Sequence, residues 1–392
     1  QDWVAQHCEG IDALTASLKA VDLEAVAKET GVARKDIEAA ARTFATSATS
    51  ATIYGLDNVP VELHRACVQA LADLSLLTGQ IGRPSTGLYP LRQGTNEQGA
   101  WDLGCVPHLL PGYRPVTDPQ ARRKVEQAWA ERKIPANPGL GLRQMVQAAA
   151  SGGIKAMLVL GDNAHLFQGE LGNVGEALKK LEFLVVQDIF LRDAAHYADV
   201  VLPEVTFAEK TGSYTNLERR IQPLHQAIEV KNSEAKPAWW VLSRLARRLK
   251  VEGLEYSGPE QIAQEMARVT PIYGGVSLER LEAEAVITLR PPTDNPLPNQ
   301  VLNSDKWYPG LQWPVPEASH KGTPILYTEG FPNGKARLMP VQTATAKPSA
   351  NGHGMLLVPG RVLLQSEREI RIVRGKLNRI QRDEQLEVHP QD

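Results

Sequence analysis

The sequence predicts an α/β protein with Rossmann-like, doubly wound, mostly parallel sheets, and three observations support this class. Apolar strands alternate with helices between residues 154 and 203. Polar residues directly follow two of those strands, as they do in open parallel sheets that bind ligands. The length of 392 residues is enough for two or three domains that each bury a core.

Three continuous apolar segments carry the strand prediction, at residues 156–160, 183–186 and 200–202. Helices are expected between them, at residues 174–181 and 192–198. Continuous apolar strands separated by helices are typical of a parallel sheet that is covered on both faces. We therefore expect all three strands to be fully buried.

Small or polar residues stand where the first two strands end. Gly161, Asp162 and Asn163 follow the first strand, and Gln187 and Asp188 follow the second. Ligands of open α/β sheets bind beyond the carboxyl ends of the strands, so these residues are candidates for contacting a nucleotide. A plain turn is the alternative, because Asp and Asn are common turn formers. No Gly-x-Gly-x-x-Gly follows the first strand, so any phosphates must be held in another way.

The N-terminal part is predicted to be mainly helical. Two short helices are expected within residues 22–44, a strand at 51–54, and a helix at 60–79 whose apolar stripe places Cys67 in a core. The first two helices resemble a DNA-binding helix-turn-helix. The second of them opens with two basic and two acidic residues (34–38), which favours helix packing over phosphate contacts.

Residues 79–115 form the most unusual stretch, with seven glycines and five prolines in 37 residues. A compact domain rarely contains so long a loop unless the loop binds something. Aromatic residues such as Trp101 and Tyr113 give this stretch enough apolar surface to pack. We expect an ordered ligand loop, with an inert packed connection as the alternative.

The remainder is predicted from short patterns. Helices are expected at residues 239–249 and 278–286, and an extended surface linker with seven prolines at 290–320. Short strands are expected at 325–327 and 336–338. The run 361–382 has seven basic residues against two acidic ones, which is typical of a solvated or partner-facing surface.

Composition excludes several classes of protein. The 43 Lys plus Arg and 45 Asp plus Glu give a net charge of -2, so there is no global basic surface for nucleic acid. No apolar run is long enough to span a membrane directly. The three cysteines (Cys8, Cys67, Cys105) are spaced for neither a metal site nor a disulfide framework, so buried or incidental thiols are expected. No signal peptide is visible, and a cytoplasmic location is expected.

Several segments, in order along the chain, resemble molybdopterin oxidoreductases of the formate dehydrogenase α-subunit type. The resemblance runs from about residue 1 to about residue 345. The segments that carry it are residues 77–84, 90–92, 96–99, 157–163, 184–190, 198–203, 208–212 and 215–220.

The resemblance implies a polypeptide that, when whole, holds a bis-(molybdopterin guanine dinucleotide) centre with molybdenum or tungsten, and a 4Fe-4S iron–sulfur cluster. The ligands of both metals are expected in the upstream part of such proteins, so this chain is expected to lack them. Carried over by motif, Arg92 matches the arginine that faces formate. Gly161 lies in a matching segment, and the positions that match contacts to the guanine dinucleotide are Asn163, Gln187, Asp188 and Lys210.

Three departures from the family pattern predict that the cofactor is bound weakly or not at all. After Pro-Leu the chain reads Arg-Gln-Gly at 92–94, where relatives read Arg-Gly-Gln. At 237–240 it reads Pro-Ala-Trp-Trp, where relatives read Pro-Asp-Trp-Trp with the acid available to a guanine edge. Residues 365–371 stand where the C-terminal barrel usually has a segment that wraps a pterin.

The pattern is also similar to the large iron–sulfur subunit of bacterial NADH:quinone oxidoreductase (complex I, an NADH dehydrogenase). Two functions therefore compete: a catalytically silent, structural electron-transfer subunit, and a fragment of a catalytic formate dehydrogenase subunit that oxidises formate to CO2. Either would have other subunits of an electron-transfer complex as partners. The expected domains are residues 1–150, 151–345, and the start of a truncated cofactor-binding barrel at 346–392.

Overall fold

A computed structural model of the chain describes residues 2–56, 59–92, 94–129, 132–161, 164–167, 171–191, 193–284 and 311–341. The chain divides into two units, Gln1–Gly55 with Ala66–Gln342 and Leu56–Arg65 with Thr343–Asp392. The sites discussed below lie in the first unit. The expected barrel start at 346–392, the basic run at 361–382 and linker residues 290–310 lie outside the described residues. The domain boundaries at residues 150 and 345 stay predictions.

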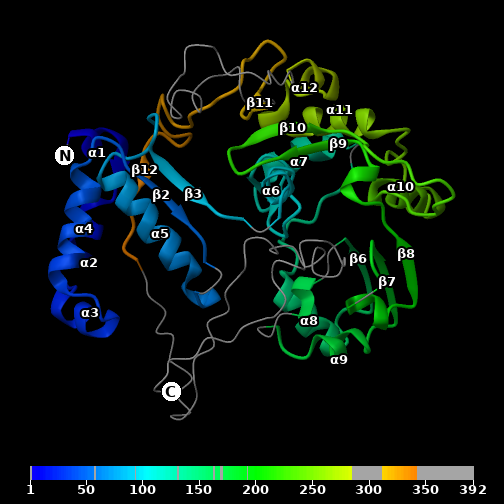
Figure 1. Ribbon diagram of the computed structural model, residues 1–392, viewed down its shortest axis with the longest axis horizontal. Helices are drawn as coiled ribbons and strands as arrows, with labels where there is room; N and C mark the ends of the chain where they lie inside the picture. The colour runs from blue at the N-terminus through cyan, green and yellow to red at the C-terminus, as the bar shows by residue number, and fades with distance from the viewer. Residues whose placement is uncertain are drawn as a thin grey trace, which may run out of the picture. The chain divides into compact units, whose positions relative to one another are not determined.

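The parallel sheet predicted between residues 154 and 203 is present. Its strands β6 (Ala156–Leu160), β7 (Phe183–Asp188) and β8 (Val200–Pro203) pair in parallel, in the order β6-β7-β8. Figure 1 shows the three arrows side by side, with helices α8 (Leu142–Ala150) and α9 (Val174–Leu178) next to them. The α/β class with parallel sheets is therefore confirmed.

One face of this sheet forms a core. Leu184 and Val186 of β7 are buried against α8, α9 and the 3-10 helix Asp193–Tyr197, and this removal of apolar surface from water stabilises the unit. The expected helices at 174–181 and 192–198 are shorter than predicted, and the second is a 3-10 helix.

The prediction that all three strands are fully buried is wrong. Strand β6 alternates half-buried and exposed residues, with Leu158 38% and Leu160 37% exposed, and Phe183 at the start of β7 is 48% exposed. Most of edge strand β8 is also exposed. The sequence shows that these side chains are apolar, but it does not show which element covers the second face of the sheet.

A second, antiparallel sheet has the order β11-β10-β9. Its strands are β9 (Gly212–Thr215), β10 (Arg220–Leu224) and β11 (Leu311–Gln312). The nearby helices are α10 (Ala238–Arg248), α11 (Pro259–Val269), the 3-10 helix Pro271–Tyr273 and α12 (Leu278–Glu284). The helices predicted at 239–249 and 278–286 correspond to α10 and α12.

The prediction of a surface linker over residues 290–320 is wrong for its described end. Leu311 is 3% exposed and Val315 is fully buried, in a core with Ile221, Tyr273 and Leu281. Pairing of β11 with β10 takes the chain into the interior in spite of its prolines. Residues 325–327, predicted as a strand, lie in bends and turns.

The N-terminal part contains short helices and strands. They are α1 (Asp2–His7), β1 (Cys8–Glu9), α2 (Ile11–Leu18), α3 (Leu23–Thr30), α4 (Arg34–Thr46), β2 (Ala51–Tyr54) and α5 (Val61–Leu77). Asp22 caps helix α3, because its side chain accepts a hydrogen bond from the backbone N–H of Glu24 at 2.9 Å. Arg34, in the helix-turn-helix-like pair, forms ion pairs with Glu24 and Glu38.

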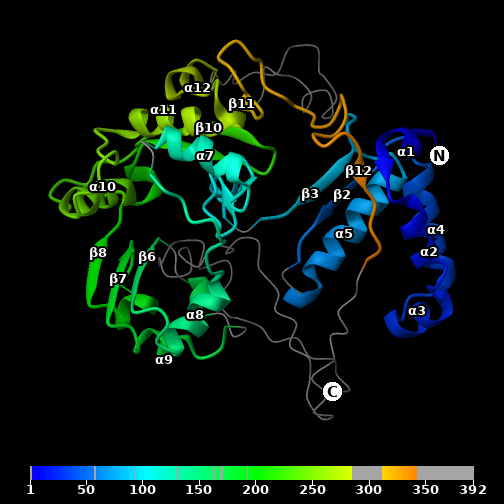
Figure 2. The ribbon, with the colours of Figure 1, turned by 180° about the vertical axis from the view of Figure 1, so that it is seen from behind.

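Strand β1 pairs in parallel with β12 (Ala336–Arg337), so chain segments more than 300 residues apart lie side by side, as Figure 2 shows from behind. Cys8, Leu14, Leu76 and Leu338 form the core of this region. The placement of Cys67 in a core is wrong, because α5 buries Leu76 instead and leaves Cys67 half-buried.

The glycine- and proline-rich stretch 79–115 is described except for residue 93, and it contains regular structure. Strand β3 (Gly87–Pro90) pairs in parallel with β2. Helix α6 (Glu97–Asp102) and the antiparallel pair β4 (Leu109–Leu110) and β5 (Arg114–Pro115) follow, and α7 (Pro119–Ala128) comes next. Apolar residues around Leu110 and Val125 hold this part together.

Candidate functional site

The carboxyl ends of the three parallel strands lie side by side. Leu160 pairs with Gln187, and the backbone N–H of Gly161 donates to the carbonyl of Gln187 at 2.9 Å. On the other side of β7, the backbone N–H of Glu204 donates to the carbonyl of Asp188 at 3.0 Å. Candidates Asp162 and Asn163 lie outside the described residues.

Gln187 and Asp188 are buried at this edge, being 0% and 4% exposed. The Gln187 side-chain amide donates to the carbonyl of Lys236 at 2.7 Å, while its buried Oε1 has no hydrogen-bond partner among the described residues. The carboxylate of Asp188 accepts from the backbone N–H of Phe190 at 3.1 Å. A buried acceptor without a partner is costly, so Gln187 Oε1 is suited to an N–H that a ligand brings.

Lys210 follows the 3-10 helix Phe207–Glu209, and its Nζ lies 3.3 Å from Oε1 of Glu204. Glu204 is 8% exposed, and its Oε2 is a second buried acceptor that lacks a partner within the described part of the chain. Burial raises the pKa of the Glu204 carboxyl, and the negative charge of nearby Asp188 adds to this rise. The Lys210 ammonium and the backbone N–H of Ala238 oppose it. Glu204, Gln187, Asp188 and Lys210 are called the strand-end cluster below.

Sequence reasoning missed Glu204, although a usable signal was present. Glu204 directly follows the third apolar strand, just as Asp188 ends the second. Its place after the third strand could therefore have added it to the candidates.

Arg92 lies in a different cluster. Its guanidinium Nη1 lies 3.1 Å from Oε1 of Glu97, and its guanidinium carbon lies 5.1 Å from the centre of the Trp101 ring. The Arg92 side chain is 18% exposed, and its buried Nε has no acceptor within the described residues. Glu97 and Trp101 belong to the same stretch, 79–115, as Arg92. Residues of this stretch therefore fix the position of the Arg92 side chain.

A buried polar network next to this loop was also missed by sequence reasoning. Asp102, which is fully buried, accepts from the Tyr113 hydroxyl at 2.6 Å, from the Gln98 amide at 2.8 Å and from the Tyr273 hydroxyl at 2.7 Å. The Tyr273 hydroxyl lies 2.6 Å from the Thr215 hydroxyl. Burial raises the pKa of Asp102, while these hydroxyl and amide donors partly oppose the rise.

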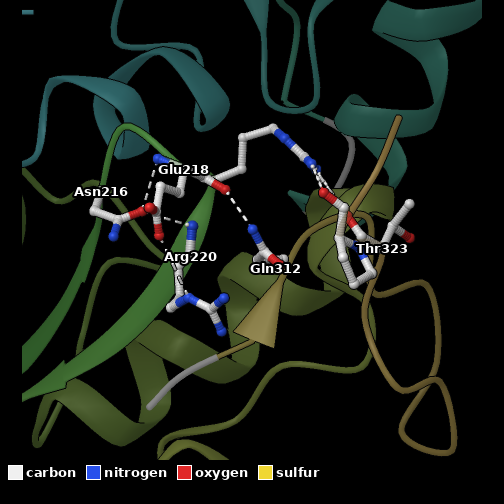
Figure 3. A network of polar contacts seen from close by, with 7 residues as sticks. Asn216, Glu218, Arg220, Gln312 and Thr323 are labelled. Carbon is white, nitrogen blue, oxygen red and sulfur yellow. Dashed lines mark hydrogen bonds and ion pairs between the residues drawn. The ribbon is translucent and has the colours of Figure 1, made fainter. Parts of the chain in front are cut away.

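The matching segment 215–220 forms a tight turn between β9 and β10. Figure 3 shows Asn216, whose side-chain oxygen accepts from the backbone N–H groups of Glu218 and Arg220 at 2.9 and 3.0 Å. Gln312 donates to the carbonyl of Glu218 at 3.0 Å. Arg219 has a left-handed backbone (φ 64°).

Arg219 connects this turn to a distant segment. Its guanidinium donates to the carbonyls of Thr323 at 3.1 Å, Pro324 at 3.0 Å and Trp313, and it stacks on the Trp313 ring at 5.2 Å. The contacts of this motif are therefore structural in the described part of the chain.

The family model for molybdopterin oxidoreductases matches residues 2–248, which is more than half of the chain. The chain belongs to the molybdopterin oxidoreductase family. Family members are associated with a molybdopterin-type cofactor. Within the described residues, no group of three or more His, Cys, Asp or Glu side chains could hold a metal ion, and no helix is long and apolar enough to cross a membrane.

Curated relatives include formate dehydrogenase subunits. "Probable oxidoreductase YjgC" of Bacillus subtilis is 41% identical over 296 residues, covering 75% of this chain and 27% of that protein. "F420-dependent formate dehydrogenase 2 subunit alpha" of Methanococcus maripaludis is 32% identical over 367 residues, covering 93% and 50%. This molybdopterin oxidoreductase chain thus spans half or less of the length of these relatives.

A solved structure supports the fold. Acetylene hydratase from Pelobacter acetylenicus superposes with a TM-score of 0.54 at 18% sequence identity, covering 72% of this chain and 41% of that one. At this identity the similarity shows the fold alone.

Proposed function

We propose that this chain is the α/β part of an electron-transfer oxidoreductase subunit that keeps half of a nucleotide site but does not oxidise formate. Its role in the complex is structural, as in the large iron–sulfur subunit of NADH:quinone oxidoreductase, and its partners are the other subunits. We propose a cytoplasmic location for this subunit, on the cytoplasmic side of a membrane complex. Any 4Fe-4S cluster and Mo or W would be held by parts of the polypeptide outside this chain.

The ion pair between Arg92 and Glu97 is the observation that best supports a catalytically silent role. A formate anion would need an arginine whose charge is not already neutralised. In this chain Glu97 lies 3.1 Å from the Arg92 guanidinium and Trp101 covers it. Because a carboxylate already pairs with this cation, attraction of a second carboxylate is weakened.

The strand-end cluster fits the nucleotide end of a molybdopterin guanine dinucleotide. Gln187 Oε1 and Glu204 Oε2 are buried acceptors that need donors, and guanine carries N–H groups on its base-pairing edge. Gly161, Asn163, Gln187, Asp188 and Lys210 are the residues proposed to surround this nucleotide. When bound in a whole enzyme, such a cofactor supplies two-electron redox chemistry at its metal.

A second candidate is a catalytic formate dehydrogenase subunit. The relatives named as formate dehydrogenase α subunits favour it, and so does the buried Arg92 Nε, which has no acceptor among the described residues. In that case Arg92 would orient formate, and Glu97 would have to release it.

The test is to express the full-length protein that contains this chain, with its partners, in a molybdenum-replete host. Bound pterin and formate-dependent dye reduction are then measured for the wild type, for Arg92→Ala and for the exposed control Arg42→Ala. We expect no formate-dependent reduction in any of them. Turnover that Arg92→Ala abolishes and Arg42→Ala leaves intact would establish the formate dehydrogenase instead.

A further inference from the structure

Glu204 occupies a distinctive place at the end of the parallel sheet. Its backbone is fixed to Asp188 by a hydrogen bond of 3.0 Å, and a parallel bridge joins it to Lys236. Its carboxylate uses one oxygen for Lys210 and leaves the other, Oε2, buried without a partner in the described part of the chain. Burying a carboxylate oxygen without a donor costs free energy, so Oε2 is suited to a donor that a ligand brings.

The same carboxylate lies next to residue 238, the first residue of helix α10. The backbone N–H of Ala238 faces it and favours its charged form, as expected for an anion at a helix N-terminus. Gln187 reaches this place too, because its amide donates to the carbonyl of Lys236. Two buried acceptors, Gln187 Oε1 and Glu204 Oε2, are therefore supplied from neighbouring strand ends.

Because both buried oxygens are acceptors, a ligand that binds here must present N–H or O–H donors. A carboxylate accepts best from two adjacent N–H groups, such as N1–H and the 2-amino group of guanine. Hypoxanthine has N1–H but lacks the 2-amino group, and adenine presents an acceptor at N1. Trp240 lies two residues after Ala238 in helix α10, and its ring has the Lys236 ammonium at 5.9 Å and the Arg244 guanidinium carbon at 4.9 Å from its centre.

We infer that Glu204 is the specificity-determining acceptor for a guanine base at the strand ends, and that it takes over the role of the acid missing at Ala238. This inference rests on the nucleotide site of the proposed function. It replaces the expectation that the Ala238 departure leaves a guanine edge without an acceptor. An acid at 238 and an acid at 204 would serve the same donors, so one of the two is sufficient.

The test uses the full-length protein from a host that makes no molybdopterin, so that no native cofactor competes. Equilibrium dialysis compares GDP with IDP, which differ only in the 2-amino group. The wild type is expected to prefer GDP by about 10- to 100-fold, the usual effect of a hydrogen bond to a charged group. Glu204→Gln, which keeps the shape of the side chain, is expected to reduce that preference to less than about 3-fold.

Two further variants complete the design. The double variant Glu204→Ala with Ala238→Asp should recover most of the GDP preference, because it returns an acid to the same place from the other element. The exposed control Glu229→Gln should behave as the wild type does. If the wild type binds GDP and Glu204→Gln keeps the full preference, the role of Glu204 is refuted while the nucleotide site stands. If the wild type binds neither nucleotide, the site and the inference fail together.

Discussion

Two buried polar clusters in this chain differ in how completely their hydrogen bonds are formed. The Asp102 network and the strand-end cluster each contain a buried carboxylate whose pKa is raised by burial. Asp102 has a donor on each oxygen: Gln98 and Tyr113 on Oδ1, and Tyr273 on Oδ2. In the strand-end cluster, Gln187 Oε1 and Glu204 Oε2 complete no hydrogen bond among the described residues, and the Ala238 N–H only faces the Glu204 carboxylate.

The difference has a physical meaning. A fully bonded network offsets the cost of burial within the fold itself, so it stabilises one arrangement of the chain. A partly bonded network carries a cost that a ligand can remove. Buried carboxylates therefore indicate a ligand site only after their hydrogen-bond partners have been counted.

Replacing Asp102 with Ala should give the largest effect and sharpen this contrast. The change leaves the buried Gln98 and Tyr273, and the partly exposed Tyr113, without their acceptor, which should lower the free energy of unfolding by about 3–5 kcal/mol. Urea unfolding followed by circular dichroism measures this. The exposed control Asp36→Ala should change it by less than about 0.5 kcal/mol. A loss of similar size in both variants would show that Asp102 has no special structural role.

Tyr273→Phe should give a smaller loss within the same network. It removes the hydroxyl that donates to Asp102 and lies 2.6 Å from the Thr215 hydroxyl, while keeping the ring in the core. We expect about 1–2 kcal/mol of destabilisation in the same unfolding measurement. Tyr327→Phe is the matched control, because Tyr327 is 42% exposed. Equal stability of the two variants would contradict a stabilising role for the Tyr273 hydroxyl.

Glu204→Gln should have the smallest effect on stability, and with the opposite sign. Since the folded state raises the pKa of Glu204, the native protein binds its proton more tightly than the unfolded chain does. Wild-type stability therefore falls as the pH rises from the ordinary glutamate pKa to the raised one. The Gln variant lacks this loss and should be more stable than the wild type above that pH window, by up to about 1 kcal/mol. The loss of the ion pair should cost little, because Lys210 is one-third exposed and water can solvate its ammonium.

The measurement is urea unfolding of both proteins between about pH 4 and pH 8. Glu182→Gln is the control, because Glu182 forms a surface ion pair with Lys155 at 2.7 Å and is 67% exposed. A strong destabilisation by Glu204→Gln would place Glu204 in the structural group with Asp102 and break the comparison.

Local patterns predicted much of the fold. The apolar stripe and flanking signals placed α5 and α10 within two residues, and the alternation of strands and helices predicted the β6-β7-β8 sheet and its adjoining strand ends. These features depend on residues that are neighbours in the sequence. The strand pattern supplied Gln187 and Asp188 as candidates and the family resemblance added Lys210, and their role as ligand contacts stays a prediction.

The other parts of the fold and of the candidate site depend on contacts between residues far apart in the sequence, which no local pattern contains. Asp102 and Tyr273 are 171 residues apart, so neither could be predicted as part of one network. Leu311 and Val315 lie among prolines that suggested a surface linker, yet they enter the core because β11 pairs with β10. The place of Glu204 after the third strand could be read from the sequence, but the bridge that it forms with the chain at Lys236 could not.

The pairing of β1 with β12 has a consequence for synthesis of the protein. Arg337 forms an ion pair with Glu9, 328 positions earlier in the sequence, and Cys8 needs Leu338 to complete its core. At about 5–20 residues per second, the ribosome would need roughly 15–65 s to make that intervening chain. During that interval Leu76 can already pack on Leu14, but the contact of Cys8 with Leu338 cannot form, so this core stays incomplete until β12 has been made.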